Sequence, residues 1–232
     1  NLLGSGNRIE AQAEMTNYTT ILWDLDGTII NSSPGVFESF NHTFRTVGMP
    51  ELTPAEMKPF MGPPLRVTFG EILKLSHEET EEALAVYRDF YLKQGGALNC
   101  ELYPGVIETI QKSKAAGITN SLATSKAERG TKLVGEHFDF LKYFDVLGTA
   151  ANDETRNTKA DVITYAFEEL RKINADLSKV ILVGDRIHDV EGAREHGIEV
   201  CLVKWGFGNE EEWADADFLV SNTEELQQLL GI

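Results

Sequence analysis

Two aspartates directly follow the first apolar run of the chain. Thr20–Trp23 is predicted to be a buried strand, and it leads into Asp24 and Asp26. Residues i and i+2 of an extended chain face the same way, so these carboxylates converge and repel each other unless a cation lies between them. A hard divalent ion such as Mg²⁺ prefers oxygen ligands of this kind. The plainer alternative is a polar turn at Gly27 that ends the strand.

Polar side chains also follow two later apolar runs. Thr124 and Ser125 follow one of them, and their hydroxyl and backbone N–H groups suit an anionic oxygen, although they also suit a simple helix cap. Asp185 follows the other run, and Asp189 shares its helical face if a helix begins there. These two carboxylates suit coordination of a metal ion or, alternatively, capping of the helix N-terminus.

Lys159 stands at the start of a predicted helix. A cation at a helix N-terminus opposes the helix dipole, which indicates an anionic partner, although an ordinary surface lysine is the alternative. Lys126 is a second candidate cation near the same groups.

Strands and helices alternate through most of the chain. The near-continuous apolar strands predict a parallel sheet covered on both faces, with ligands at the carboxyl ends of the strands. The four polar sites should therefore meet, and carboxylates, a metal, hydroxyls and a lysine together suit phosphoryl transfer. The predicted strands are 20–23, 118–123, 143–147, 180–183 and 198–203, and the predicted helices are 104–116, 127–137, 160–173, 190–196 and 223–230.

Residues 31–101 break this alternation. Two capping boxes, Thr53–Glu56 and Ser76–Glu79, predict helix starts, and aromatic residues recur at helical spacing. We found no convincing strand in this region. It is predicted to be an all-helical insertion with its own aromatic core.

Composition limits the function further. The net charge of −16 opposes binding to a nucleic-acid polymer or to an anionic membrane. The two cysteines, Cys100 and Cys201, fit no disulfide framework or zinc site, and they suit a cytoplasmic protein. Residues 1–14 are irregular and precede Met15, so we expect them to be an added leader.

In chain order, the motifs resemble those of the haloacid dehalogenase superfamily. The resemblance covers about residues 18–232, and it implies a Rossmann-like, doubly wound α/β core (15–32 and 102–232) with an inserted α-helical cap (33–101). The cap is similar to that of phosphoglycolate phosphatases and 5′-nucleotidases. The residues that carry the resemblance are Asp24–Thr28, Thr124, Lys159, Asp185 and Asp189, with Gly62–Leu65 and Trp205–Gly208 for the branch.

The resemblance implies a reaction through an aspartyl-phosphate. Asp24 is then the nucleophile, and Asp26 is the general acid and later the base. Thr124 and the backbone at Ser125 bind the phosphoryl group, and Lys159 neutralises its oxygens. Two departures concern this set: Ser125 stands where relatives often have Asn, and Ala follows Lys159 where many have Pro.

The resemblance also implies a bound Mg²⁺. Asp24, the backbone carbonyl of Asp26 and the side chain of Asp185 would hold the ion, and Asp189 would support it through water. In the cap, residues 57–66 are expected to face the substrate, with Arg66 as a candidate contact to a substrate carboxylate or second phosphate, or else a surface arginine.

The expected activity is Mg²⁺-dependent hydrolysis of a small phosphate ester, of the phosphoglycolate or nucleoside 5′-monophosphate type, by a monomer or dimer. A phosphotransferase similar to β-phosphoglucomutase and a non-catalytic phosphate-binding or regulatory protein are the alternatives. His188, beside the fourth motif, is expected on a helix surface. Dehalogenation is disfavoured because it needs no acid at position 26.

Overall fold

Six parallel strands form the centre of the protein. The computed structural model describes residues 18–232, so the expected leader, residues 1–14, lies outside the described residues. The sheet order is β5-β4-β1-β6-β7-β8, and all neighbouring strands are parallel. The strands are β1 (Thr20–Trp23), β4 (Thr119–Ala127), β5 (Val146–Ala150), β6 (Val180–Gly184), β7 (Glu199–Val203) and β8 (Phe218–Val220).

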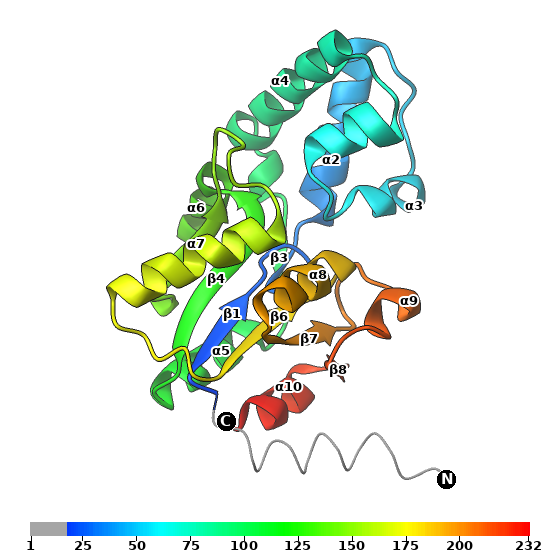
Figure 1. Cartoon of the computed structure of the whole chain (residues 1–232). Coiled ribbons are helices and arrows are strands. Elements are labelled where there is room, and N and C mark those ends of the chain that lie inside the picture. The colour runs from blue at the N-terminus through cyan, green and yellow to red at the C-terminus, as the bar shows by residue number, and fades with distance from the viewer. Residues whose placement is uncertain (1–17) are drawn as a thin grey trace.

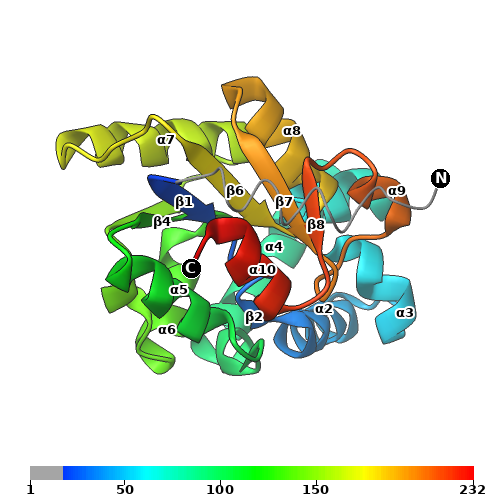
Figure 2. The same cartoon turned by 90° about the horizontal axis from the view of Figure 1, so that it is seen from below.

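Helices cover both faces of this sheet, with α7 and α8 on one face and α5, α6 and α10 on the other (Figure 2). Side chains alternate across β1 accordingly: Ile21 and Trp23 pack into the cluster with α5, α6 and α10, and Leu22 packs into the cluster with α7 and α8. The predicted doubly wound α/β fold is confirmed. The helices are α5 (Val106–Ala115), α6 (Glu128–His137), α7 (Lys159–Lys172), α8 (Ile187–His196), α9 (Glu210–Trp213) and α10 (Thr223–Leu230).

Two strands of the sheet, β4 and β5, differ from their predicted bounds by more than one residue, and the edge strand β8 was not predicted. β4 continues past Ala123 to Ala127, and its pairing with β5 shifts between these residues as at a β-bulge. The polar residues Thr124–Lys126 hide this extension in the sequence. β5 begins three residues later than predicted. The edge strand β8 has only three residues, too few for a periodic signal.

The inserted helical region lies beyond the carboxyl ends of the strands (Figure 1). Both predicted capping boxes are present, at Thr53 and Ser76. Aromatic side chains form the expected separate core, in which Phe40 packs against Phe60, Phe69 and Tyr87. The helices are α2 (Ser33–Val47), α3 (Pro54–Met57) and α4 (His77–Lys93), with short helical turns at Lys58–Phe60, Val67–Ile72 and Gly96–Leu98.

A small antiparallel pair joins the two ends of the insertion. β2 (Ile30–Asn31) pairs with β3 (Glu101–Leu102), so the expectation of no strand from 31 to 101 was wrong at both margins. Two-residue strands are too short for sequence periodicity to reveal. The pair holds the two crossing segments side by side. The division into core and cap at residues 33 and 101 stays a prediction. Within residues 18–232, no helix is both long enough and apolar enough to cross a membrane.

Candidate active site

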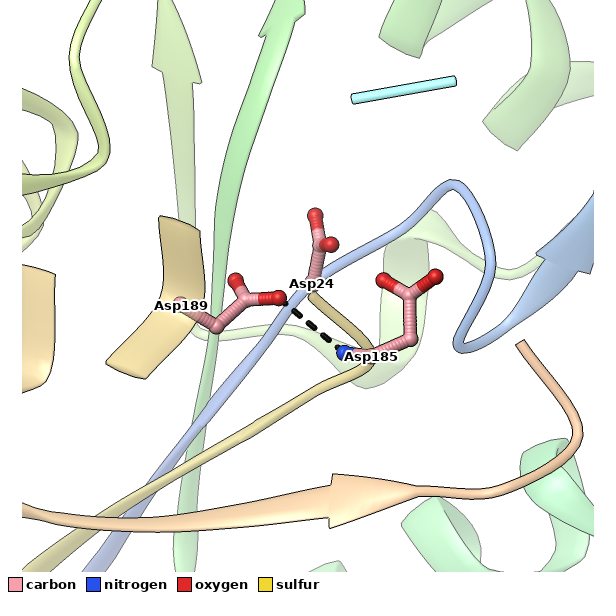
Figure 3. A group of neighbouring side chains, drawn as sticks. All are labelled: Asp24, Asp185 and Asp189. Atoms are coloured by element: carbon pink, nitrogen blue, oxygen red, sulfur yellow. Dashed lines mark hydrogen bonds between the residues drawn. The ribbon is translucent and has the colours of Figure 1, made fainter. Parts of the chain in front are cut away.

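Three carboxylates meet at the carboxyl ends of the two central strands. Asp24 follows β1, Asp185 follows β6, and Asp189 lies in the first turn of α8. One oxygen atom of each lies within 4.8 Å of the others. Figure 3 shows the three side chains converging, with the Asp185 N–H donating to Asp189 Oδ2 at 3.0 Å. The sequence prediction that these residues come together is therefore confirmed.

Lys159 lies between two of these carboxylates. As the first residue of α7, it places Nζ 3.1 Å from Asp24 Oδ1 and 3.0 Å from Asp189 Oδ1, and it donates to the Ala123 carbonyl at 2.6 Å. Its side chain is only 4% exposed. Gly192 of α8 makes room for it, because a Cβ there would lie 2.6 Å from Lys159 Cγ. The anionic partner that its helix position indicated is thus a pair of aspartates.

Two glycines allow the backbone to approach Asp185 closely and hold its carboxylate in place. Gly27 has φ +84, and a Cβ at that position would lie 2.0 Å from Asp185 Oδ2. Asp185 Oδ2 accepts from the Phe207 N–H at 2.8 Å, and a Cβ on Gly206 would lie 2.4 Å from Asp185 Cβ. Trp205 in the same loop donates to the Thr28 carbonyl at 3.0 Å. The loop 205–208 therefore links the first and fourth motifs.

Burial and mutual repulsion perturb the acids of this cluster. Burial, with the nearby charge of Asp189, raises the pKa of Asp24 to about 7, although Lys159 opposes the shift. Burial and the charges of Asp24 and Asp189 also raise the pKa of Asp185 well above its ordinary value. A bound cation would offset this repulsion.

The residues present fit a hard divalent cation. Asp185 Oδ1 is buried without a hydrogen-bond partner among the described residues, although its other oxygen is held by Phe207. Carboxylate oxygens are the ligands that Mg²⁺ accepts. Asp189 is engaged differently: its Oδ2 caps the N–H groups of Asp185 and Arg186, and its Oδ1 faces Lys159. The two backbone hydrogen bonds of Asp189 leave only its Oδ1, the oxygen that faces Lys159, for a cation.

Asp26 lies beside the second candidate lysine. Lys126 Nζ is 3.3 Å from Asp26 Oδ1 and 3.4 Å from Oδ2. Lys126 is 8% exposed and Asp26 is 29% exposed. Thr124 is almost fully buried, and its Oγ1 accepts from the Lys126 N–H at 3.0 Å. Each lysine therefore pairs with a different aspartate of the first motif: Lys159 pairs with Asp24, and Lys126 pairs with Asp26.

A cavity of about 290 Å³ lies between this cluster and the helical region. Asp24, Asp26, Thr124, Ser125, Lys159, Asp185 and Asp189 all line it. Its other walls are largely apolar, with Val36, Phe40, Phe60, Leu65 and Leu92 among them. Of the expected segment 57–66, residues 60–65 line the cavity. The site is a polar recess under an apolar roof, the usual make-up of a small-molecule pocket.

Arg66 does not belong to this wall. Its guanidinium pairs with Glu81 in α4 and lies 2.8 Å from Glu154 in the loop between β5 and α7. Glu154 also accepts from Arg88 at 3.0 Å. Its donors join the helical region to the core, which fits the alternative of a surface arginine, and a contact to substrate stays a prediction. The sequence could not show this, since the partners lie 15 and 88 residues away.

His188 lines the cavity, contrary to the expectation of a helix-surface position. Its Nε2 is buried without a hydrogen-bond partner among residues 18–232. A Cβ on Gly62 would lie 3.4 Å from its ring, so the helical region covers this face of α8. The sequence showed the helix but not the element that packs over it.

Comparison with known proteins places the chain in a family. A family model for haloacid dehalogenase-like hydrolases matches residues 21–203. The chain is 33% identical over 222 residues to the tyrosine-protein kinase PtkA of Mycobacterium tuberculosis, covering 91% of this chain and 72% of that protein. It is 29% identical over 195 residues to a 5′-nucleotidase of Pseudomonas aeruginosa, covering 84% and 86%.

Solved structures agree with this result. The crystal structure of a predicted phosphatase from Clostridium acetobutylicum superposes with a TM-score of 0.84 at 30% identity, covering 92% of this chain and 98% of that one. The motif order, the sheet, the inserted helical region and the acidic cluster all match the sequence-based expectation. The chain belongs to the haloacid dehalogenase-like hydrolases.

Proposed function

We propose that the protein is a Mg²⁺-dependent phosphomonoesterase that hydrolyses a small phosphorylated metabolite through an aspartyl-phosphate. The observation that carries the proposal is the position of Asp24. Its carboxylate is 13% exposed, faces the cavity, and lies beside Lys159, Asp185 and Asp189. Keeping a carboxylate in such a buried, mutually repulsive cluster costs folding free energy. This cost favours a catalytic role for Asp24.

Asp24 performs the first step in this proposal. One of its oxygens attacks phosphorus, the bond from phosphorus to the leaving oxygen breaks, and Asp26 gives that oxygen its proton. The Leu25 N–H at 2.8 Å and Lys159 at 3.1 Å both contact Asp24 Oδ1 and fix the carboxylate. Thr124, the backbone at Ser125 and Lys159 receive the phosphoryl oxygens.

Water completes the reaction. Asp26 takes a proton from water as the water oxygen attacks phosphorus, and the bond to Asp24 breaks to release inorganic phosphate. A Mg²⁺ held by Asp24, the Asp26 carbonyl and Asp185, with Asp189 as support, would supply the charge that lets a carboxylate approach a phosphate dianion. The helical region excludes bulk water from the phosphorylated aspartate.

Phosphate release from a panel of esters tests the proposal. The panel holds phosphoglycolate, nucleoside 5′-monophosphates and sugar phosphates, each with Mg²⁺ and with EDTA, and Asp24→Asn is the blank. Release that depends on both Mg²⁺ and Asp24 supports the proposal, and the best ester identifies the substrate class. No release from any ester would contradict it.

A phosphotransferase is the second candidate. The relative named tyrosine-protein kinase motivates it, and a mutase of the β-phosphoglucomutase kind shares the same first step. Such an enzyme would retain phosphate on Asp24 and pass it to an acceptor other than water. Slow hydrolysis, together with transfer of labelled phosphate to an added hydroxyl acceptor, would favour this candidate. A non-catalytic phosphate-binding protein would show neither hydrolysis nor phosphate transfer.

A further inference from the structure

A tyrosine of the helical region reaches the lysine that holds Asp26. Tyr91, near the end of α4, hydrogen-bonds through its hydroxyl with Lys126 Nζ, and the ammonium lies 4.6 Å from the centre of the Tyr91 ring. Lys126 belongs to β4 in the core (Figure 1). The chain Tyr91–Lys126–Asp26 therefore runs from the helical region to the first motif.

The Lys126 ammonium lies between the Tyr91 hydroxyl and the Asp26 carboxylate. Ammonium–carboxylate hydrogen bonds are usually about 2.7–2.9 Å long. Lys126 instead lies 3.3 Å and 3.4 Å from the two Asp26 oxygens, nearly equidistant from them. The Tyr91 hydroxyl accepts a hydrogen bond from the ammonium on its other side. Lys126 thus faces the Asp26 carboxylate without closing on a single oxygen.

The surroundings are built around this contact. Gly130 of α6 leaves space where the two side chains cross, because a Cβ there would lie 3.4 Å from both Lys126 Cε and Tyr91 Cε1. The Tyr91 ring stacks on Tyr87 at 5.7 Å between centroids, and Tyr87 packs against Phe40 at 4.9 Å. The position of Tyr91 is thereby tied to the aromatic core of the helical region.

We propose that Tyr91 is a positioning residue that orients Asp26 through Lys126 for transfer of a proton to the leaving group. The inference rests on the proposed phosphatase function and adds a condition to it. Because Tyr91 belongs to α4 and Lys126 to β4, this orientation of Asp26 requires the contact between α4 and the core. Asp26 touches the reacting atoms, whereas Tyr91 acts through Lys126.

Tyr91→Phe with a series of ring-substituted phenyl phosphates tests the proposal. The variant keeps the ring and removes only the hydroxyl. kcat/KM covers the steps up to phosphoenzyme formation, so the water step does not enter. p-Nitrophenolate leaves readily without a proton, whereas phenolate needs one. General acid catalysis contributes about 10²–10⁴-fold, so partial misorientation should lower kcat/KM for phenyl phosphate by about tenfold. For p-nitrophenyl phosphate we expect a change below about twofold.

The slope of log kcat/KM against the pKa of the leaving phenol separates positioning from structural damage. Positioning makes the slope steeper in Tyr91→Phe, whereas general damage lowers all esters equally and would overturn the inference. Tyr143→Phe is the control. It removes a tyrosine hydroxyl that accepts from Gln111 Nε2 at 2.7 Å, away from the residues that line the cavity, and it should leave the slope unchanged.

A double-mutant cycle completes the test. Lys126→Met alone should steepen the slope, and adding Tyr91→Phe to it should steepen it no further; additive changes would contradict action through Lys126. If the unaltered chain shows no Mg²⁺-dependent release from any of these esters, the proposed function itself fails and the inference falls with it. Turnover with an unchanged slope in Tyr91→Phe would refute the inference about Tyr91 but not the proposed function.

Discussion

Removing the charge of Lys159 should destabilise the fold far more than removing that of an exposed lysine. Lys159→Met keeps most of the stem volume and leaves Asp24 and Asp189 without their shared cation. The three side chains are 4%, 13% and 1% exposed, and the ammonium lies 3.1 Å and 3.0 Å from the two carboxylates. The variant therefore retains two unpaired buried acids.

The expected loss follows from this burial. Breaking a buried ion pair by removing one partner lowers the free energy of unfolding by about 3–5 kcal/mol. The same helix provides a control: Lys172 lies 2.7 Å from Glu169, but it is 70% exposed. Exposed pairs contribute about 0–1 kcal/mol, so Lys172→Met should change the free energy of unfolding by no more than that.

Urea denaturation in EDTA at pH 8 measures both variants. We expect Lys159→Met to lose at least about 3 kcal/mol, and less at pH 6, because protonation of Asp24 relieves the unpaired charge. Losses of equal size in the two lysine variants would refute the reasoning. If Lys159→Met does not fold, Lys159→Met/Asp189→Asn removes one orphaned charge and should regain part of the stability; no gain would equally count against the account.

Three further expectations concern the site and its roof. Glu154→Gln breaks both ion pairs that join Arg66 and Arg88 to the core, so KM should rise a few-fold, whereas Glu81→Gln should leave KM nearly unchanged because the pairs with Glu154 remain. The raised pKa of Asp24, about 7, means that the folded state keeps a proton that the unfolded chain releases above about pH 4. Thermal melts in EDTA should therefore show stability falling from about pH 4 to pH 7, with Mg²⁺ restoring more at pH 8 than at pH 5; a flat profile would contradict the shift. Gly27→Ala places a Cβ 2.0 Å from an Asp185 oxygen, so calorimetry should show weakened Mg²⁺ binding, and unchanged affinity would exclude this steric argument.

Local signals explain why most of the sheet was predictable. β1 and β6 are short, fully buried apolar runs that end at glycine or aspartate, so their sequences alone mark them as central strands. The carboxyl ends of parallel strands meet by topology, which is enough to bring Asp24, Asp185 and Lys159 together. The two capping boxes likewise predict their helices from four residues each.

Long-range contacts explain what the sequence did not show. The extension of β4 through Thr124–Lys126 depends on pairing with β5 across a register shift, and no periodic pattern announces it. His188 was misplaced because the segment around Gly62, far away in the chain, covers it. The partners of Arg66 were equally out of reach of the sequence, because Glu154 lies 88 residues away.

The pairing of the lysines shows the same limit inside the site. Lys126 and Lys159 were rival candidates for one cation position, and the structure gives each a different aspartate. The sequence places both lysines near the strand ends, but only packing decides which carboxylate each one meets. Tyr91 is 35 residues from Lys126 and could not be assigned to it from spacing.

Trapping phosphate on Asp24 tests the central claim most directly. The protein is incubated with a ³²P-labelled ester and Mg²⁺, quenched in acid, digested and analysed by mass spectrometry. The account predicts a phosphorylated peptide that contains Asp24, absent in EDTA and in Asp24→Asn. Mg²⁺-dependent phosphate release that proceeds at the same rate in Asp24→Asn, with no labelled peptide, would contradict it.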